Sequence, residues 1–469
     1  MKFREALKII EGLRFIADNI SLMSALGQSC IMDSDFITEH EALEKEYDYL
    51  ATSINTLKDP RTKDTVDEIR HLLMQARDIR TTIKRLEENS VLDDVEFFEI
   101  KGLSILSKEI GRLMRRLELS KFTTFDIPDL GKVTEILDPE KTANTHFHIY
   151  DAYSEELAQK RQQLKKLQAA ERSNTEETDS ILAECMMIEA RIREELSKSL
   201  QPYADRLHKA LLTIGKIDLL LAKAHFAMQF CLAIPNLTQT YIHFTGLHYL
   251  PVEEGLKKAN KEFQAIDVSL NKGVTVITGA NMGGKTITLK SLAMAQAMAQ
   301  FAFGVPAKKG GTIPVSKIAL SIGDSQSAAE GLSSFGAEIL KIDGILTEAA
   351  ADDRMLILID EPARTTNPEE GKAIVSAIIE ILMKYPSISV LTTHYSIITA
   401  GCTRLKVKGV RDNLPNDGKE LLPGSLTDYM DYSLVRDDRS EVDREALTIA
   451  RMIGISENFS QTIENNLIP

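Results

Sequence analysis

The sequence has few cysteines, no long apolar run and no excess of basic charge, and each shortage excludes a class of protein. Its four cysteines form no CxxC pair, which argues against zinc fingers and disulfide frameworks. No apolar stretch reaches the roughly 18 residues that a membrane span needs, and the amino terminus has no signal-peptide pattern, so we expect a cytoplasmic protein. With 56 basic against 69 acidic residues the net charge is −13, which gives no support to general nucleic-acid binding.

What the sequence does contain is length for two to four structural units and a change of pattern along the chain. Helical periodicity dominates the first half, and β-branched runs gather after residue 260. We therefore predict an all-α domain over residues 1–240 and an α/β domain over residues 241–469.

A helical arm is expected within the first domain, at about residues 152–202. Apolar residues step by three or four from Ile181 to Ile214, and the polar segment 173–178 separates them from a shorter helical stretch. This pattern predicts an antiparallel helical hairpin, although an ordinary helical-bundle segment would show the same periodicity. Pro202 is expected to kink the returning helix or to begin a new one.

Three short apolar segments in the second half predict buried parallel strands, at 274–278, 355–360 and 388–393. Helical patterns at 285–302 and 370–384 lie between them, as crossover connections require. The expected fold class is a doubly wound, mainly parallel α/β sheet preceded by the helical domain. Residues 411–429 predict an exposed loop, and residues 440–468 a last helical stretch.

A glycine-rich motif follows the first predicted strand. Residues 279–286 read GANMGGKT, which satisfies GxxxxGK[ST] between a strand and a helix. The glycines Gly279, Gly283 and Gly284 allow backbone amides to face phosphate oxygens. Lys285 is expected to neutralise the β- and γ-phosphates and Thr286 to place its hydroxyl on Mg²⁺. The motif predicts a phosphate-binding loop rather than a glycine-rich turn without a ligand.

Polar residues end the other two predicted strands. Asp360 and Glu361 follow the run MLILI, and a buried strand ending in two carboxylates predicts a ligand at that sheet edge. We expect Asp360 to hold Mg²⁺ through water and Glu361 to orient or deprotonate the attacking water. His394 ends the third strand and is expected to sense the γ-phosphate, although a histidine there can also be structural.

Five segments with this order and spacing resemble the ATPase domain of the MutS family of DNA mismatch-repair proteins, over roughly residues 244–400. They are ITGANMGGKTITLKS, FGVPAKK, GLSSFGAE, LILIDEPARTT and TTHYS, and IDLLLAKAHFAMQF at 217–230 resembles the family's helical core. The resemblance includes Asn281 and Met282 in the phosphate loop. It implies an ABC-type ATPase that acts as a homodimer or with a second MutS-like subunit, that Ser333 reaches the γ-phosphate bound by the partner, and that Phe263 packs on the adenine.

The sequence also departs from the family pattern. PARTT at 362–366 replaces a usual glycine pair, and no stretch matches the family's mismatch-reading and connector domains. Short, acidic chains of this build resemble the reactivating components associated with adenosylcobalamin-dependent lysine 5,6-aminomutase. That resemblance implies a protein complex as the client of the ATPase, which we prefer. A DNA clamp of the mismatch-repair or recombination type stays an alternative, and so does a scaffold that binds ATP without hydrolysing it.

Overall fold

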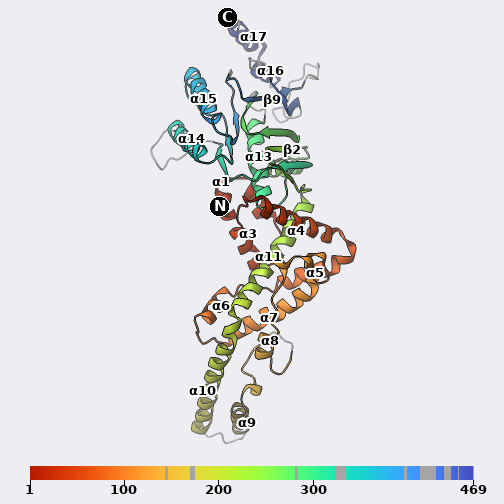
Figure 1. Ribbon diagram of the computed structural model, residues 1–469, viewed down its shortest axis with the longest axis vertical. Helices are drawn as coiled ribbons and strands as arrows, with labels where there is room; N and C mark the ends of the chain where they lie inside the picture. Colours follow the sequence, from red (N-terminus) through yellow and green to blue (C-terminus); the bar gives the residue numbers. More distant parts are fainter. Residues whose placement is uncertain are drawn as a thin grey trace. The chain divides into compact units, whose positions relative to one another are not determined.

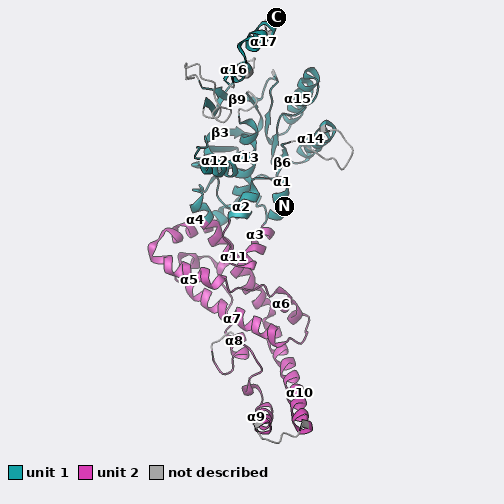
Figure 2. Cartoon of the chain, turned by 180° about the vertical axis from the view of Figure 1, so that it is seen from behind, with its two compact units in different colours: residues 1–19, 35–48, 226–469 teal, residues 20–34, 49–225 magenta. Residues whose placement is uncertain are grey.

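The chain forms two compact units in a computed structural model that describes residues 1–142, 146–169, 175–279, 284–323, 334–395, 399–411, 429–437, 445–452 and 454–467. Unit 1 comprises residues 1–19, 35–48 and 226–469, and unit 2 comprises residues 20–34 and 49–225 (Figures 1 and 2). Helices α4 (His40–Lys58) and α11 (Ala204–Gln229) each pass from one unit into the other. None of the described helices is both long enough and apolar enough to span a lipid bilayer.

The two units differ from the predicted linear division at residue 240, because the amino-terminal residues pack within unit 1. The ring of Phe3 lies 5.1 Å from that of Phe301 and 6.0 Å from that of Phe303, and Phe36 lies 5.5 Å from Phe301. Helices α1 (Phe3–Ile9) and α2 (Leu13–Asn19) therefore belong to the same unit as the sheet. Sequence periodicity predicts helices but not the partners of their apolar faces.

Unit 2 is helical in its described part. Besides its shares of α4 and α11, it contains α3 (Ala25–Asp33), α5 (Lys63–Leu73), α6 (Arg80–Glu87), α7 (Asp94–Met114), α8 (Gly131–Leu137), α9 (Glu155–Ala169) and α10 (Thr175–Leu200). Helix α7 begins with a capping box, in which Asp93 Oδ1 accepts hydrogen bonds from the amides of Val95 and Glu96, and Glu96 Oε2 accepts one from the amide of Asp93. Short 3₁₀ turns lie at Pro60–Thr62, Glu118–Lys121, Thr123–Phe125, Asp151–Tyr153 and Gln201–Tyr203.

Helices α9 and α10 run antiparallel. Glu156 pairs with Arg191 at 3.9 Å, and further along α9 Arg161 pairs with Glu189 at 2.8 Å, so rising numbers on α9 meet falling numbers on α10. Of the apolar residues predicted to form one seam, Tyr203 is half-buried against the core of this unit, and the others are buried in it: Ile181, Cys185, Ile188, Ile192, Leu196, Leu200, Leu207, Leu211 and Ile214. Where Pro202 predicts an interruption, the 3₁₀ turn Gln201–Tyr203 separates α10 from α11.

Unit 1 is built on a six-stranded sheet of order β10-β9-β4-β8-β7-β6. Its strands are β4 (Gly273–Thr278), β6 (Lys317–Ser321), β7 (Met355–Ile359), β8 (Ile388–Thr392), β9 (Thr403–Val410) and β10 (Met430–Arg436). All neighbouring pairs are parallel except β9 with β10. The three predicted strands correspond to β4, β7 and β8, which lie side by side in the middle of the sheet.

Helices cover both faces of this sheet. Met355, Ile357 and Ile359 of β7 share a buried core with α14 (Ser334–Ala351) and α15 (Pro368–Leu382). Leu356 and Leu358 alternate to the opposite face, and the buried helix α13 (Lys285–Gln300) also contacts β7. The mixed, mainly parallel sheet with a helical region before it is compatible with a phosphate-loop domain.

A second sheet of order β1-β5-β2-β3 was not predicted from the sequence. It consists of β1 (Asn236–Leu237), β2 (Tyr241–Leu247), β3 (Ile266–Asn271) and β5 (Lys309–Thr312), and α12 (Leu250–Lys258) joins β2 to β3. The predicted last helical stretch contains α16 (Glu445–Met452) and α17 (Glu457–Leu467). Most of the predicted loop at 411–429 lies outside the described residues.

Candidate functional site

The candidate site lies where β4, β7 and β8 end, because parallel neighbours bring their carboxyl ends to one edge of the sheet. Gly279 follows β4, and Gly284 is the N-cap residue of α13, with a φ of 78°. This left-handed conformation suits glycine and turns the backbone into the helix. Lys285 and Thr286 form the first turn of α13, so both side chains start beside the strand ends.

Lys285 lies at the centre of the site. Its side chain is 4% exposed, and its Nζ donates a hydrogen bond of 2.6 Å to the carbonyl of Gly279 and lies 3.0 Å from Glu361 Oε1. A buried ammonium needs such partners because desolvation of an unpaired charge is costly. The predicted phosphate-binding residue, Lys285, and the predicted base, Glu361, therefore lie in contact with each other.

Asp360 directly follows β7 and accepts hydrogen bonds from α13 and from β8. Thr286 Oγ1 donates a hydrogen bond of 2.7 Å to Asp360 Oδ2, and Thr392 Oγ1, at the end of β8, donates one of 2.6 Å to Asp360 Oδ1. A hydroxyl and a carboxylate side by side are the hard oxygen donors that Mg²⁺ prefers, so Thr286 and Asp360 fit such an ion.

Glu361 directly follows Asp360 and has an unusual backbone conformation. Its φ is 42° and that of Ala363 is 60°, and left-handed non-glycine residues of this kind gather at functional sites. The amide of Glu361 donates hydrogen bonds to Thr392, to Oγ1 at 2.9 Å and to the carbonyl at 3.2 Å. These contacts help the chain to hold a strained conformation that aims Glu361 at Lys285.

His394 follows β8 by two residues and has a buried Nδ1 for which the described residues supply no hydrogen-bond partner. Burial lowers the pKa of His394 from its ordinary value of 6.5; Glu361 opposes this shift, and Lys285 and Arg364 reinforce it. The ring is therefore neutral at pH 7. An imidazole nitrogen that has no partner among the described residues and lies beside these charged groups is suited to contact a polar group of a bound molecule.

The remaining predicted site residues are divided between described and undescribed parts. Phe263 is half-buried just before β3, and its neighbour Gln264 is tied to β10: Nε2 donates to Asp431 Oδ1 at 2.8 Å, and Oε1 accepts from the amide of Tyr432 at 3.2 Å. Asn281, Met282, Gly283 and Ser333 lie outside the described residues.

Two residues of the site were missed from the sequence. Thr392 stands in the quoted TTHYS segment, but its bond to Asp360 follows only from the pairing of β7 with β8. Tyr432 is nearly 150 residues from the phosphate loop, yet a Cβ atom at Gly284 would lie 3.0 Å from its Cδ1 atom. No sequence pattern around Tyr432 indicates this position, which depends on β10 pairing with β9.

Comparison with known proteins identifies a domain across this site. Residues 275–415 match the family model "MutS domain V". Two proteins named "Endonuclease MutS2" match 57% of this chain: that of Listeria innocua is 33% identical over 285 residues, and that of Streptococcus gordonii is 34% identical over 271 residues. The chain spans about a third of their length, 35% and 32% respectively.

Neither relative is named as an aminomutase-associated protein. The matched residues 275–415 include the whole of β6 to β9 and of α13 to α15, together with all of β4 but its first two residues. They thus contain Lys285, Thr286, Asp360, Glu361 and His394, the residues that converge in the structure. Over residues 275–415 the chain therefore matches domain V of the MutS family.

Proposed function

We propose that this chain binds ATP with Mg²⁺ and hydrolyses it, and that the conformational change so produced acts on a client. The observation that carries the proposal is the convergence of Lys285, Thr286, Asp360 and Glu361 at one sheet edge, linked by contacts of 2.6–3.0 Å. ABC-type folding of the domain and hydrolysis at a dimer interface are part of the same proposal.

Each side chain has a distinct task in this mechanism. Lys285 neutralises the β- and γ-phosphates, and Gly279, Gly284 and the first turn of α13 direct amides toward them. Thr286 and Asp360 hold Mg²⁺, which supplies charge neutralisation at the transferred phosphate. Glu361 accepts the proton of the attacking water. His394 contributes a neutral ring nitrogen to the phosphate end.

We infer that the site is completed by a second subunit, either another copy or a related ATPase. Ser333 would reach the phosphate bound by the partner, and Phe263 would pack on the adenine of its own subunit. The support for Phe263 is the tie from Gln264 to the strand whose Tyr432 covers Gly284.

For the client we favour a protein complex. Described basic residues of the arm are largely engaged: Lys160 pairs with Glu184, Arg161 with Glu189, Arg191 with Glu156, Arg193 with Asp94 and Lys198 with Glu194. Cations held by carboxylates are poorly available to phosphates, which supply most nonspecific nucleic-acid affinity. An adenosylcobalamin-dependent aminomutase in need of reactivation is one client of this class; its support is the acidic composition of the chain.

DNA is the second candidate client, favoured by one observation. The relatives with 33% and 34% identity are named as endonucleases. Their likeness covers 57% of this chain, so it bears on the ATPase part more than on the arm.

The test of the ATPase uses Glu361→Gln and Lys285→Ala side by side. Glutamine cannot accept the proton, so Glu361→Gln should retain ATP binding and lose phosphate release. Lys285→Ala should weaken binding itself by about 1.5–3 kcal/mol, the range for a hydrogen bond to a charged group. Calorimetric titration measures ATP binding, and a phosphate-release assay measures hydrolysis. Wild-type phosphate release by Glu361→Gln, or undiminished affinity in Lys285→Ala, contradicts the assigned roles.

A further inference from the structure

The face of α10 that points away from its core carries a cluster of exposed apolar side chains. Leu182, Met186 and Met187 are 40%, 58% and 64% exposed, and Ala183 and Ala190 are exposed beside them. At 3.6 residues per turn these five positions fall on one side of the helix. We call this cluster the α10 stripe.

The opposite face of α10 consists of buried apolar side chains. Ile181, Cys185, Ile188, Ile192 and Leu196 are buried in the core of unit 2. The helix thus has two apolar faces, and the described residues of the chain cover one of them. A helix that is apolar on both sides is typical of an element buried between two layers.

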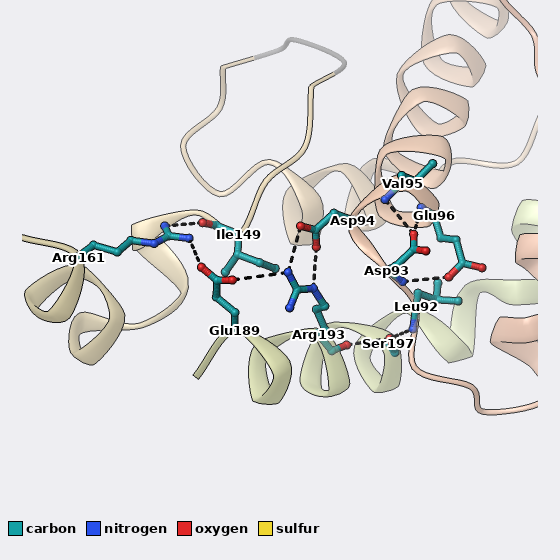
Figure 3. Close-up of polar contacts among 10 residues, drawn as sticks. All are labelled: Leu92, Asp93, Asp94, Val95, Glu96, Ile149, Arg161, Glu189, Arg193 and Ser197. Atoms are coloured by element: carbon teal, nitrogen blue, oxygen red, sulfur yellow. Dashed lines mark hydrogen bonds and ion pairs between the residues drawn. The ribbon is translucent and has the colours of Figure 1, made fainter. Parts of the chain in front are cut away.

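Polar contacts join α10 to α7, to α9 and to Leu92 (Figure 3). Arg193 donates to both carboxylate oxygens of Asp94 at 2.7 and 3.1 Å, and Glu189 accepts from Arg161 at 2.8 Å. Ser197 Oγ accepts a hydrogen bond of 2.9 Å from the amide of Leu92. These contacts come from residues at and beyond the carboxyl end of the stripe, and they fix the orientation of α10 and thereby which of its sides is exposed.

Such a surface is unusual for a protein without a partner there. Single exposed apolar residues are common, but contiguous ones mark interaction sites. The adjacent Met186 and Met187 also indicate an interaction site, because the unbranched side chains of methionine adapt to different partner surfaces.

Charge around the stripe indicates the partner's chemistry. Residues Thr175–Ala190 contain five acids and no lysine or arginine. Glu184 and Glu189 are paired with bases of α9 or α10, whereas no ion pair within the described residues engages Glu176, Glu177 or Asp179. Carboxylates without an ion pair among the described residues repel phosphate groups and attract lysine and arginine, and the apolar strip beside them favours an apolar partner face.

We propose that the α10 stripe is a docking surface for a protein partner that presents an amphipathic helix, with its apolar face flanked by lysine or arginine. Its apolar residues cover Leu182, Met186 and Met187, and its basic residues pair with Glu176 and Asp179. This deepens the proposal of a protein client and rests on it, but docking itself requires no ATP hydrolysis.

The test titrates the whole chain, labelled with ¹³C in its methionine methyl groups, with a helical peptide of leucine and lysine at amphipathic spacing. A peptide with glutamate in place of lysine is the matched probe. The leucine–lysine peptide should shift the Met186 and Met187 resonances, and the leucine–glutamate peptide should not. Met186→Glu with Met187→Glu should weaken binding at least about tenfold, because burial of one methionine contributes about 1.5–3 kcal/mol.

Met74→Glu is the control, since Met74 of unit 2 is also 58% exposed but lies outside the stripe. It should bind the peptide as the wild type does. The proposal is overturned if neither peptide shifts the two methyl groups, if both do so equally, or if Met74→Glu weakens binding as much as the stripe variant. It is also overturned if duplex DNA, or a second copy at rising protein concentration, produces the shifts instead.

The same samples separate this inference from the ATPase. Lys285→Ala should lose nucleotide affinity and keep peptide binding, and the stripe variant should keep basal phosphate release. Peptide binding without any ATP hydrolysis by the wild type would leave the docking surface standing and reject the proposed activity. ATP hydrolysis without peptide binding would reject the docking surface and leave the proposed activity standing.

Discussion

At the scale of single residues, Lys101 is a buried cation in the helical core of unit 2. Its side chain is fully buried, with Nζ 3.1 Å from Asp138 Oδ1 and donating to Tyr150 Oη at 2.9 Å. Lys101→Met removes the cation beside the buried carboxylate, and breaking such a pair typically costs about 3–5 kcal/mol. Urea unfolding measures the loss. Lys132→Met, which removes the exposed pair with Glu135, should leave the midpoint unchanged; equal effects of the two would contradict the role of burial.

His394 gives stability a predictable dependence on pH. Its folded-state pKa is lowered from 6.5 by burial, with Lys285 and Arg364 reinforcing and Glu361 opposing this. Below pH 6.5 the unfolded chain therefore binds the proton more readily than the folded one, so this contribution is complete above that pH and is lost as the pH falls toward the folded pKa. Urea unfolding at several pH values should show a smaller acid-side loss in His394→Asn. Identical pH profiles for variant and wild type would refute this contribution of His394 to the pH dependence of stability.

At the scale of elements, α13 links the site to the amino-terminal segment of unit 1. Lys285 begins the helix, and buried Gln300 ends it, where its Nε2 donates to the carbonyls of Ile37 and Val315 at 2.8 and 2.7 Å and its Oε1 accepts from the amide of Val315 at 3.0 Å. This buried network ties the far end of the phosphate-loop helix to the segment that leads into α4.

Gln300→Leu should destabilise unit 1. Leucine makes none of these hydrogen bonds, and each buried backbone group left without one costs about 1–3 kcal/mol. Amide exchange near residues 37 and 315 should speed up together with a lower urea midpoint. Gln162→Leu, on the exposed face of α9, is the control and should change neither. Undisturbed exchange near residue 37 in Gln300→Leu would argue against the link.

At the scale of the whole molecule, the net charge of −13 and the paired bases of the arm predict weak DNA binding. At physiological salt we expect a Kd in the nonspecific range, about 10⁻⁴ to 10⁻⁶ M, without preference for mismatched or branched duplexes. Fluorescence anisotropy with matched, mismatched and branched DNA, with and without ATP, measures this. Submicromolar, structure-selective binding that responds to nucleotide would establish DNA as the client.

The sequence by itself determined the local features. Strands β4, β7 and β8 and helix α13 lie within two residues of their predicted bounds, because an apolar run or a strand–glycine–helix motif carries its signal within a short window. The position of Asp360 and Glu361 after a buried strand was equally local, and the tertiary structure then placed Asp360 beside Thr286 and Glu361 beside Lys285.

Only the tertiary structure decided which distant segments meet. The contact of Tyr432 with Gly284, the bond of Thr392 to Asp360 and the place of Phe3 in unit 1 each join residues far apart in the chain. The tertiary structure also decided that the second apolar face of α10 is exposed, because the sequence predicts a helix there but not the burial of each of its sides. Periodicity records which residues are apolar, whereas the packing of the whole chain determines which of those apolar faces are covered.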